Sequence, residues 1–243
     1  KNVLSPQSYE FNNNYTRVLI FTNTKKVWRY NTRGEYWLYD IFANKLIKLG
    51  KGLASQSLMF AKFSPDGKRI AYVSEHNIFT EEISSGVITK LTVDGSKKLI
   101  NGTFDWVYEE EFGCRDGFRW SPDGARIAFW QLDATKIRDY YMLNTTDSNY
   151  SHIVPVEYPK VGEAPSPVRI GVVNLSNRYI KWMEIDGDPQ QHYLPRMEWA
   201  GVHELVVQQL DRKQQESKLK YCNVTDGKSS TCWAESSTSW VDL

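Results

Sequence analysis

Short hydrophobic segments separated by turn residues repeat along the chain, and two of them are near copies of each other. Residues 63–72 read Phe-Ser-Pro-Asp-Gly-Lys-Arg-Ile-Ala-Tyr, and residues 120–129 read Trp-Ser-Pro-Asp-Gly-Ala-Arg-Ile-Ala-Phe. Fainter copies run over residues 11–21 and 199–207, where the turn has drifted. Each copy has an aromatic residue, a tight turn in which Pro and Gly supply the required backbone angles, and then an apolar strand.

A further hairpin is predicted after each of these copies. Apolar runs face each other across turn residues at 36–40 with 46–49, 78–83 with 87–91, 170–175 with 179–185, and 219–224 with a run ending at 233. Two hairpins make a unit of four strands, and about four such units are legible. Repeating four-stranded units of about 40–50 residues are typical of β-propeller blades. We therefore expect an all-β fold that is part of a β-propeller, with insertions around 105–112 and 131–167.

Composition narrows the range of partners. The 243 residues carry 30 basic and 29 acidic side chains, so the net charge is close to zero and binding to nucleic acid is not expected. No apolar run approaches the ~18 residues of a membrane span. No metal-binding motif occurs, and Gly50-Lys-Gly52 is predicted to be a turn rather than a dinucleotide loop, so neither a metal nor another cofactor is expected. The chain opens at Lys1 without a Met or a signal peptide, which we interpret as an internal cut.

The first insertion carries the most informative run of the chain. Residues 105–112 read Asp-Trp-Val-Tyr-Glu-Glu-Glu-Phe, with three consecutive carboxylates. Such like charges repel each other unless they are solvated or a cation lies among them. A short exposed helix could explain them without a function, because acidic side chains suit the first turn of a helix.

The cysteines and the N-glycosylation sequons indicate the cellular compartment in which the protein resides. Cys222 and Cys232 flank a turn signal at Asp226-Gly227, so they could close a hairpin as a disulfide. Cys114 is left over and is expected to be a packed small hydrophobe. Six Asn-x-Ser/Thr sequons also occur. Together these features favour export to an oxidising compartment, whether periplasmic, secreted or cell-surface.

The 105–112 motif resembles the double-glutamate motif of the dipeptidyl peptidase IV family, in the prolyl oligopeptidase superfamily. The resemblance implies that the motif lies on a short helical excursion from an eight-bladed propeller, and that Glu110 and Glu111 bind the free α-ammonium of a peptide substrate. An α-amino group has a pKa near ~8 and three donors, so two carboxylates can accept from it. Family members carry a Cys pair at the equivalent hairpin, which supports the bridge between Cys222 and Cys232.

Two further segments match the same family. Its Trp-Arg pair corresponds to Trp28-Arg29, and the family Arg reaches the P2 carbonyl of the substrate and steadies the glutamates, a role that falls to Arg29 here. Without the resemblance, a lone Arg on a strand is usually a solvated edge residue. Residues 158–162 match a Tyr-Pro-Lys-x-Gly signature. The segment around it, residues 131–167, then corresponds to an arm that helps to form a homodimer, although a long mobile loop is the alternative.

The resemblance covers the whole chain, residues 1–243, as a partial N-terminal propeller domain. The G-x-S-x-G nucleophile elbow is absent. No catalytic residue is therefore assigned, and the family's C-terminal α/β-hydrolase domain is expected to lie outside this chain, which should be inactive alone. The implied function is the substrate-binding part of a serine exopeptidase that releases Xaa-Pro or Xaa-Ala dipeptides from N-termini. The alternatives are a catalytically inactive, channel-associated family member and a plain scaffold propeller.

Overall fold

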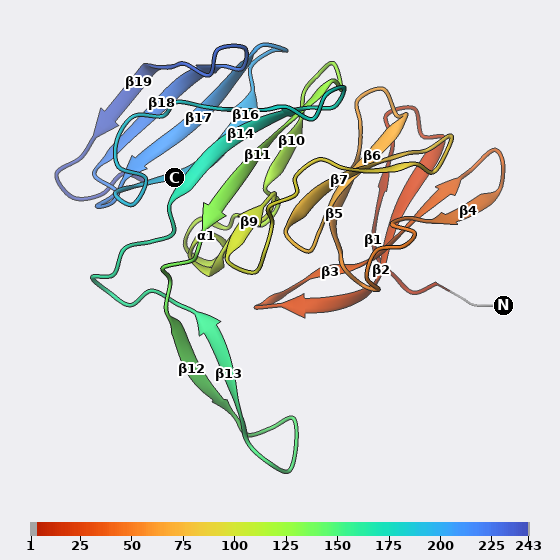
Figure 1. Ribbon diagram of the computed structural model, residues 1–243, viewed down its shortest axis with the longest axis horizontal. Coiled ribbons are helices and arrows are strands. Elements are labelled where there is room, and N and C mark those ends of the chain that lie inside the picture. Colours follow the sequence, from red (N-terminus) through yellow and green to blue (C-terminus); the bar gives the residue numbers. More distant parts are fainter. Residues whose placement is uncertain (1–3, 243) are drawn as a thin grey trace.

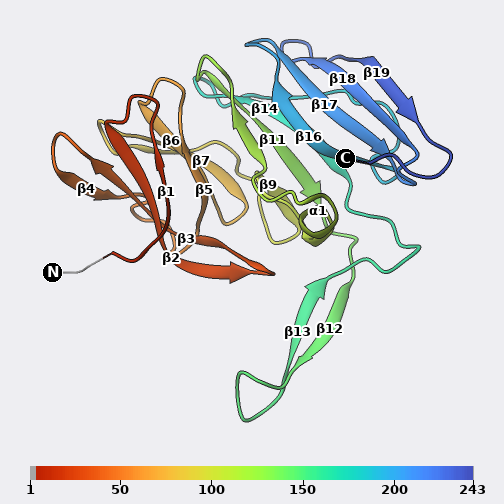
Figure 2. The same ribbon diagram turned by 180° about the vertical axis from the view of Figure 1, so that it is seen from behind.

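The structure is a computed structural model and describes residues 4–242. Within that range it contains nineteen strands and one helix, and the strands form a fan of antiparallel sheets (Figures 1 and 2). The strands group into four blades of four strands each, and the first two blades are joined through β3 and β5 into one eight-stranded sheet, so the predicted all-β propeller portion with about four blades is confirmed. In the described range no helix has the length and apolar character needed to cross a membrane.

The blades follow one another along the chain. Blade I contains β1 (Pro6–Phe11), β2 (Arg17–Val27), β3 (Tyr30–Asp40) and β4 (Lys45–Lys48). Blade II contains β5 (Leu58–Phe63), β6 (Arg69–Ser74), β7 (Asn77–Glu82) and β8 (Ile88–Lys90). Blade III contains β10 (Phe118–Trp120), β11 (Arg126–Asp133), β14 (Val168–Asn174) and β15 (Ile180–Trp182), with β9 (Leu99–Asn101) paired to the far end of β11. Blade IV contains β16 (His192–Trp199), β17 (Glu204–Asp211), β18 (Glu216–Asn223) and β19 (Ser229–Ser236).

The repeated Ser-Pro-Asp-Gly segments form the same turn in blades II and III. Ser64 Oγ donates to Asp66 Oδ1 at 2.6 Å and accepts from Arg69 N at 2.9 Å. Ser121 Oγ makes the equivalent bonds to Asp123 and Arg126 at 2.6 and 2.9 Å. The side chains thus satisfy backbone groups that the tight turn leaves unpaired, which explains why the sequence pattern recurs.

In blades III and IV the tryptophan that opens the repeat ties its blade to the preceding one. Trp120 Nε1 donates to the backbone oxygen of Lys62 at 3.4 Å, and Trp199 Nε1 donates to that of Arg119 at 3.2 Å. Lys62 and Arg119 occupy equivalent positions, each directly before the repeat aromatic of the first strand of its own blade. The same bond thus recurs between the first strands of blades II and III and between those of blades III and IV.

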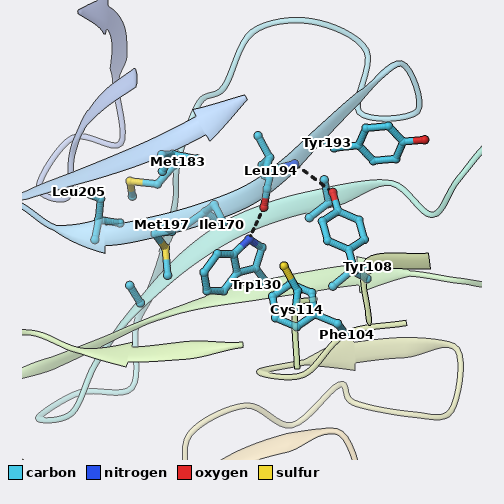
Figure 3. Close-up of a cluster of buried hydrophobic side chains, with 14 of the residues drawn as sticks. Phe104, Tyr108, Cys114, Trp130, Ile170, Met183, Tyr193, Leu194, Met197 and Leu205 are labelled. Atoms are coloured by element: carbon cyan, nitrogen blue, oxygen red, sulfur yellow. Dashed lines mark hydrogen bonds between the residues drawn. The ribbon is translucent and has the colours of Figure 1, made fainter. Parts of the chain in front are cut away.

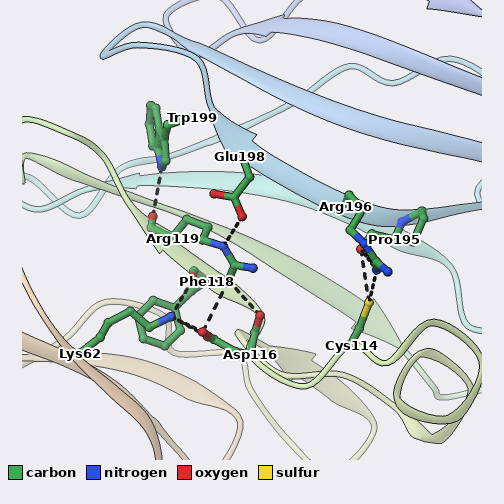
Figure 4. A network of polar contacts seen from close by, with 9 residues as sticks. All are labelled: Lys62, Cys114, Asp116, Phe118, Arg119, Pro195, Arg196, Glu198 and Trp199. Atoms are coloured by element: carbon green, nitrogen blue, oxygen red, sulfur yellow. Dashed lines mark hydrogen bonds and ion pairs between the residues drawn. The ribbon is translucent and has the colours of Figure 1, made fainter. Parts of the chain in front are cut away.

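Charged side chains on these first strands, together with Asp116 in the segment before β10, alternate in sign (Figure 4). Lys62 Nζ donates to Asp116 Oδ1 at 2.6 Å, Arg119 Nη1 lies 3.6 Å from Asp116, and Arg119 Nε donates to Glu198 at 2.8 Å. Lys62 is largely buried, and its ammonium also lies 3.9 Å from the ring centroid of Phe118. Because each charge has an opposite neighbour, the network joins blades II, III and IV without leaving a buried charge unpaired.

The second insertion forms an arm that stands away from the blades (Figures 1 and 2). Its strands, β12 (Asp139–Asn144) and β13 (His152–Glu157), pair only with each other. At its base the ring of Tyr158 lies 4.4 Å from that of Trp106. The expected start of the insertion at Gln131 is slightly early, since residues 131–133 complete β11, and the arm occupies 134–167.

The predicted disulfide between Cys222 and Cys232 is wrong in this structure, where both are free thiols. The tight turn that follows β18 pairs Cys222 with Ser229, and a bulge places Cys232 beside Leu219 and Lys220. The two cysteines are therefore offset by two to three residues along the strands, about 7–10 Å, which a disulfide cannot span. Cys222 packs in the core, whereas Cys232 is exposed and its thiol donates to the Leu219 oxygen at 3.3 Å.

Candidate functional site

The helical excursion predicted from the acidic motif is α1 (Trp106–Phe112), between blades II and III. Asp105 is its N-cap and accepts a hydrogen bond from Tyr108 N at 3.1 Å, while Gly113 ends the helix with a positive φ of 64°. Ser166 Oγ donates to the other Asp105 oxygen at 2.6 Å. Burial raises the pKa of Asp105, and the two donors oppose this shift by stabilising the charged cap.

The buried face of α1 fixes its position against blades III and IV (Figure 3). Tyr108 is 1% exposed and its hydroxyl accepts a hydrogen bond from Leu194 N at 3.0 Å. Trp130 of β11 donates through Nε1 to the oxygen of the same Leu194 at 2.7 Å. Phe104 stacks on Tyr108 with ring centroids 5.5 Å apart. The helix is thus anchored by aromatic packing and by the hydrogen bond from Leu194, while Glu110 and Glu111 lie on its less buried faces.

Glu110 and Arg29 lie together, as the family resemblance implies. Arg29 is at the tip of the β2–β3 hairpin, next to Trp28, which has a positive φ of 50°. Its Nε donates to both carboxylate oxygens of Glu110, at 2.7 and 2.6 Å. The Arg29 side chain is 70% exposed, and exposed ion pairs add little to stability. The pair therefore contributes little to the stability of the fold.

Glu111 follows directly and is exposed. Within residues 4–242 its carboxylate forms no hydrogen bond or ion pair, so it is free to accept donors from a ligand. The negative charge of Glu111 also affects the pKa of Tyr193 in β16. Burial raises the pKa of the Tyr193 hydroxyl, Arg212 lowers it, and Glu111 raises it further. The C-terminal part of α1 thus presents two adjacent carboxylates, Glu110, which is paired with Arg29, and Glu111, which is unpaired among the described residues.

Glu109 lies apart from this pair. It is 5% exposed, and its Oε1 is 3.7 Å from Arg115 Nε, too far for a hydrogen bond. Neither atom has a hydrogen-bond partner among the described residues. Burial raises the pKa of Glu109 to about 7, and Arg115 opposes the shift. Both residues line a pocket of about 290 Å³ between α1, the β2–β3 hairpin and the base of the arm.

Sequence reasoning did not find the residues that support the glutamates. Asp105 was part of the motif, and its type and position before the helix are an N-cap signal. Ser166, Tyr193 and Arg115 carried no signal, because they approach α1 only through the packing of distant segments. Residues 4–242 bring no group of three or more metal-binding side chains together.

The fold and the site define a class: a β-propeller portion that carries an acidic helix facing an arginine from blade I. Residues 12–243 match the family model described as the dipeptidyl peptidase IV N-terminal region. The chain therefore belongs to the dipeptidyl peptidase IV family, and the resemblance inferred from its motifs is confirmed.

Individual relatives agree with this assignment. The chain is similar to the crystal structure of Porphyromonas gingivalis dipeptidyl peptidase 4, with a TM-score of 0.91 and 30% identity over 98% of this chain and 34% of that one. It is 28% identical to a probable dipeptidyl peptidase 4 of Emericella nidulans, over 97% of this chain and 31% of the relative. It is also 28% identical to the inactive dipeptidyl peptidase 10 of Rattus norvegicus, over 92% and 29%. The chain thus spans about a third of the length of these relatives.

Proposed function

We propose that this chain is the substrate-anchoring part of a serine exopeptidase that releases Xaa-Pro or Xaa-Ala dipeptides from peptide N-termini. The observation that carries the proposal is the arrangement of Glu110 and Glu111 on α1, with Arg29 bound to the first and the second free. Membership of the dipeptidyl peptidase IV family supports it.

In this proposal the two carboxylates bind the α-ammonium of the substrate. A carboxylate has about four lone-pair sites, so Glu110 can accept from the ammonium while it keeps Arg29. Two charge-assisted acceptors suit a cation with three donors. Arg29, whose guanidinium is mostly exposed, also offers donors to the P2 carbonyl. Holding the amino end at a fixed point selects the bond two residues further on.

The chemistry of cleavage belongs to a C-terminal hydrolase domain, which would supply the nucleophile, base and oxyanion hole. A catalytically inactive, protein-binding family member is the second candidate, and the similarity to the inactive rat relative supports it. The two candidates differ in the nucleophile elbow, so a complete reading frame that carries G-x-S-x-G favours the enzyme.

The proposal also includes export of the protein to an oxidising compartment, whether periplasmic, secreted or cell-surface.

The arm supports a homodimer. Tyr141 and Leu143 of β12 are each 67% exposed, and they lie opposite Pro155 and Ile153 of β13, giving one apolar face. An isolated two-stranded hairpin is marginally stable in water, so a partner surface that covers this face would stabilise it. We expect Tyr141→Asp with Leu143→Asp to convert the complete protein to a monomer in light scattering after size exclusion, while Tyr15→Asp on blade I leaves it dimeric.

The substrate site is tested by three neighbouring substitutions in the complete enzyme. Glu110→Gln and Glu111→Gln should each lower kcat/KM for dipeptide substrates by about 30-fold to several thousand-fold, because a buried ammonium loses a charged partner, at a cost of about 2–5 kcal/mol. Glu109→Gln should have a much smaller effect, because the Glu109 side chain lies against Arg115 and not beside the other two carboxylates. Substrates with an acetylated N-terminus should be refused. Equal cleavage of acetylated and free peptides, or a dominant effect of Glu109→Gln, would refute the assignment.

A further inference from the structure

The tip of the β2–β3 hairpin is held by more than its contact with Glu110. Arg29 is mostly exposed, and its side-chain partner among the described residues is that single carboxylate. The ladder between β2 and β3 is irregular towards the tip, with register shifts on both sides of Lys25. Neither burial nor regular pairing therefore fixes the direction in which Arg29 points.

The adjacent residue, Tyr30, makes a second contact to the region of α1. The guanidinium carbon of Arg115 lies 3.7 Å from the centroid of the Tyr30 ring, which is the geometry of a close cation–π contact. Arg115 belongs to the segment that leaves α1 towards β10. Tyr30 thus joins the hairpin tip to this segment through Arg115, whereas Arg29 joins the tip to α1 through Glu110.

Arg115 is in turn held from inside by Glu109. The Arg115 side chain is 31% exposed, and Glu109 behind it is 5% exposed. Their closest atoms, 3.7 Å apart, attract through charge rather than through a hydrogen bond, since both remain without a hydrogen-bond partner in the described chain. Two adjacent helix residues, Glu109 and Glu110, therefore act on two adjacent tip residues, one directly and one through Arg115.

We propose that Tyr30 and Arg115, backed by Glu109, are positioning residues that hold Arg29 against Glu110 and so prepare the ammonium site before substrate binds. The inference rests on the proposed function and adds to it the residues that keep its arginine in place. None of the three touches the substrate in this arrangement.

The charge on Glu109 controls how strongly Arg115 is held in its place against Tyr30. When Glu109 is ionised it attracts Arg115, and when it gains a proton the attraction is lost. Its pKa of about 7, raised by burial, places this change near neutral pH. The other charged or titratable groups of the pocket that Glu109 lines, or on its own helix, are Tyr108, Glu110, Glu111, Arg115, Arg33, His76, Lys97 and Glu157. Burial lowers the pKa of His76 and so disfavours its charged form.

The test compares Tyr30→Leu, which removes the aromatic ring, with Tyr30→Phe, which keeps it, in the complete protein. We expect Tyr30→Leu to raise KM for a dipeptide substrate by about 5- to 30-fold with kcat within about twofold, and Tyr30→Phe to stay within about twofold of the parent. Tyr179→Leu is the matched control, because Tyr179 is exposed on another blade and lies 5.9 Å from Lys181.

Hydrogen exchange gives a readout that does not depend on hydrolysis. Protection factors of the amides of residues 28–30 should fall in Tyr30→Leu and not in Tyr30→Phe. In the parent they should also fall as the pH is lowered through 7, whereas Glu109→Gln should show low protection without this step. An unchanged KM and unchanged protection in Tyr30→Leu, or equal damage from Tyr30→Phe, would overturn the inference. Failure of the proposed function would instead appear as unchanged KM in Glu110→Gln and Glu111→Gln.

Discussion

The hydroxyl of Tyr108 accepts a hydrogen bond from the backbone N–H of Leu194 at 3.0 Å, and this bond ties the acidic helix to the first strand of blade IV. Tyr108 lies two residues before Glu110, so the packing between blades III and IV determines where the glutamates stand. The site is therefore carried by the propeller core and not by a free surface loop.

Loss of that hydroxyl should destabilise the protein. In Tyr108→Phe the Leu194 N–H is left buried without an acceptor, which costs about 1–3 kcal/mol of unfolding free energy. Urea denaturation of the two proteins measures the difference. Tyr179→Phe, at an exposed position, should leave the midpoint unchanged, and an equally small effect at Tyr108 would show that water replaces the lost acceptor.

The helix cap should matter in a similar way. Asp105→Ala removes the acceptor of Tyr108 N and leaves Ser166 Oγ without its partner. We expect a loss of about 1–2 kcal/mol in unfolding free energy from the cap. Ser166→Ala should cost less, because the bond from Tyr108 N remains. Unfolding curves that rank the two variants in the opposite order would show that Ser166, not the cap, orders this helix.

Glu109 should make stability depend on pH in a defined direction. Its folded pKa of about 7 is above the ordinary value of 4.5, because burial disfavours the charge. Between these two values the folded state holds a proton that the unfolded state has released, so the contribution of Glu109 to unfolding free energy falls as pH rises from about 4.5 to 7. The difference in urea midpoint between the parent and Glu109→Gln should change across this window and be flat above it. A difference that is constant from pH 4.5 to 8 would contradict the raised pKa.

The three cysteines should differ in reactivity and none should be oxidised. Thiol titration of the unfolded, unreduced protein should give three equivalents, which the predicted disulfide would reduce to one. In the folded protein Cys232 should react first, because it is exposed. Burial raises the pKa of both Cys114 and Cys222 to about 11, so few thiolates form there at neutral pH. Rapid labelling of Cys222 in the native state would contradict the packing of blade IV.

The blade architecture was predictable because its determinants are local. The bonds from Ser64 and Ser121 that define the repeated turns close within six residues, and Pro and Gly at fixed places mark them. Strand pairs with short turns follow from alternation of apolar positions. Such interactions leave a readable pattern even where distant contacts are unknown.

The disulfide was not predictable from the same kind of pattern. Whether Cys222 faces Cys232 depends on the register of one hairpin, and here the Gly227 N–H to Asn223 oxygen bond and a bulge at Leu219 and Lys220 set that register. A change of one or two residues in turn geometry would pair different side chains. Turn residues alone do not specify that choice.

The site was predictable only in part. Glu110, Glu111 and Arg29 were identified by resemblance to a family, and the structure brings Arg29 to Glu110. Nothing in residue spacing indicates that Arg115 lies on Tyr30 or that Glu109 is buried behind it. Those contacts join segments from different blades, whose relative placement arises from tertiary packing.

The bridge between Arg29 and Glu110 also has a consequence for the order of folding. The two residues are 81 positions apart, and the whole of blade II lies between them in the chain. Closing so long a loop has a high entropic cost unless the intervening segment is already compact, so the bridge should form only after blade II has docked against its neighbours. A nascent chain would then complete the contact between Arg29 and Glu110 late, once at least three blades have assembled.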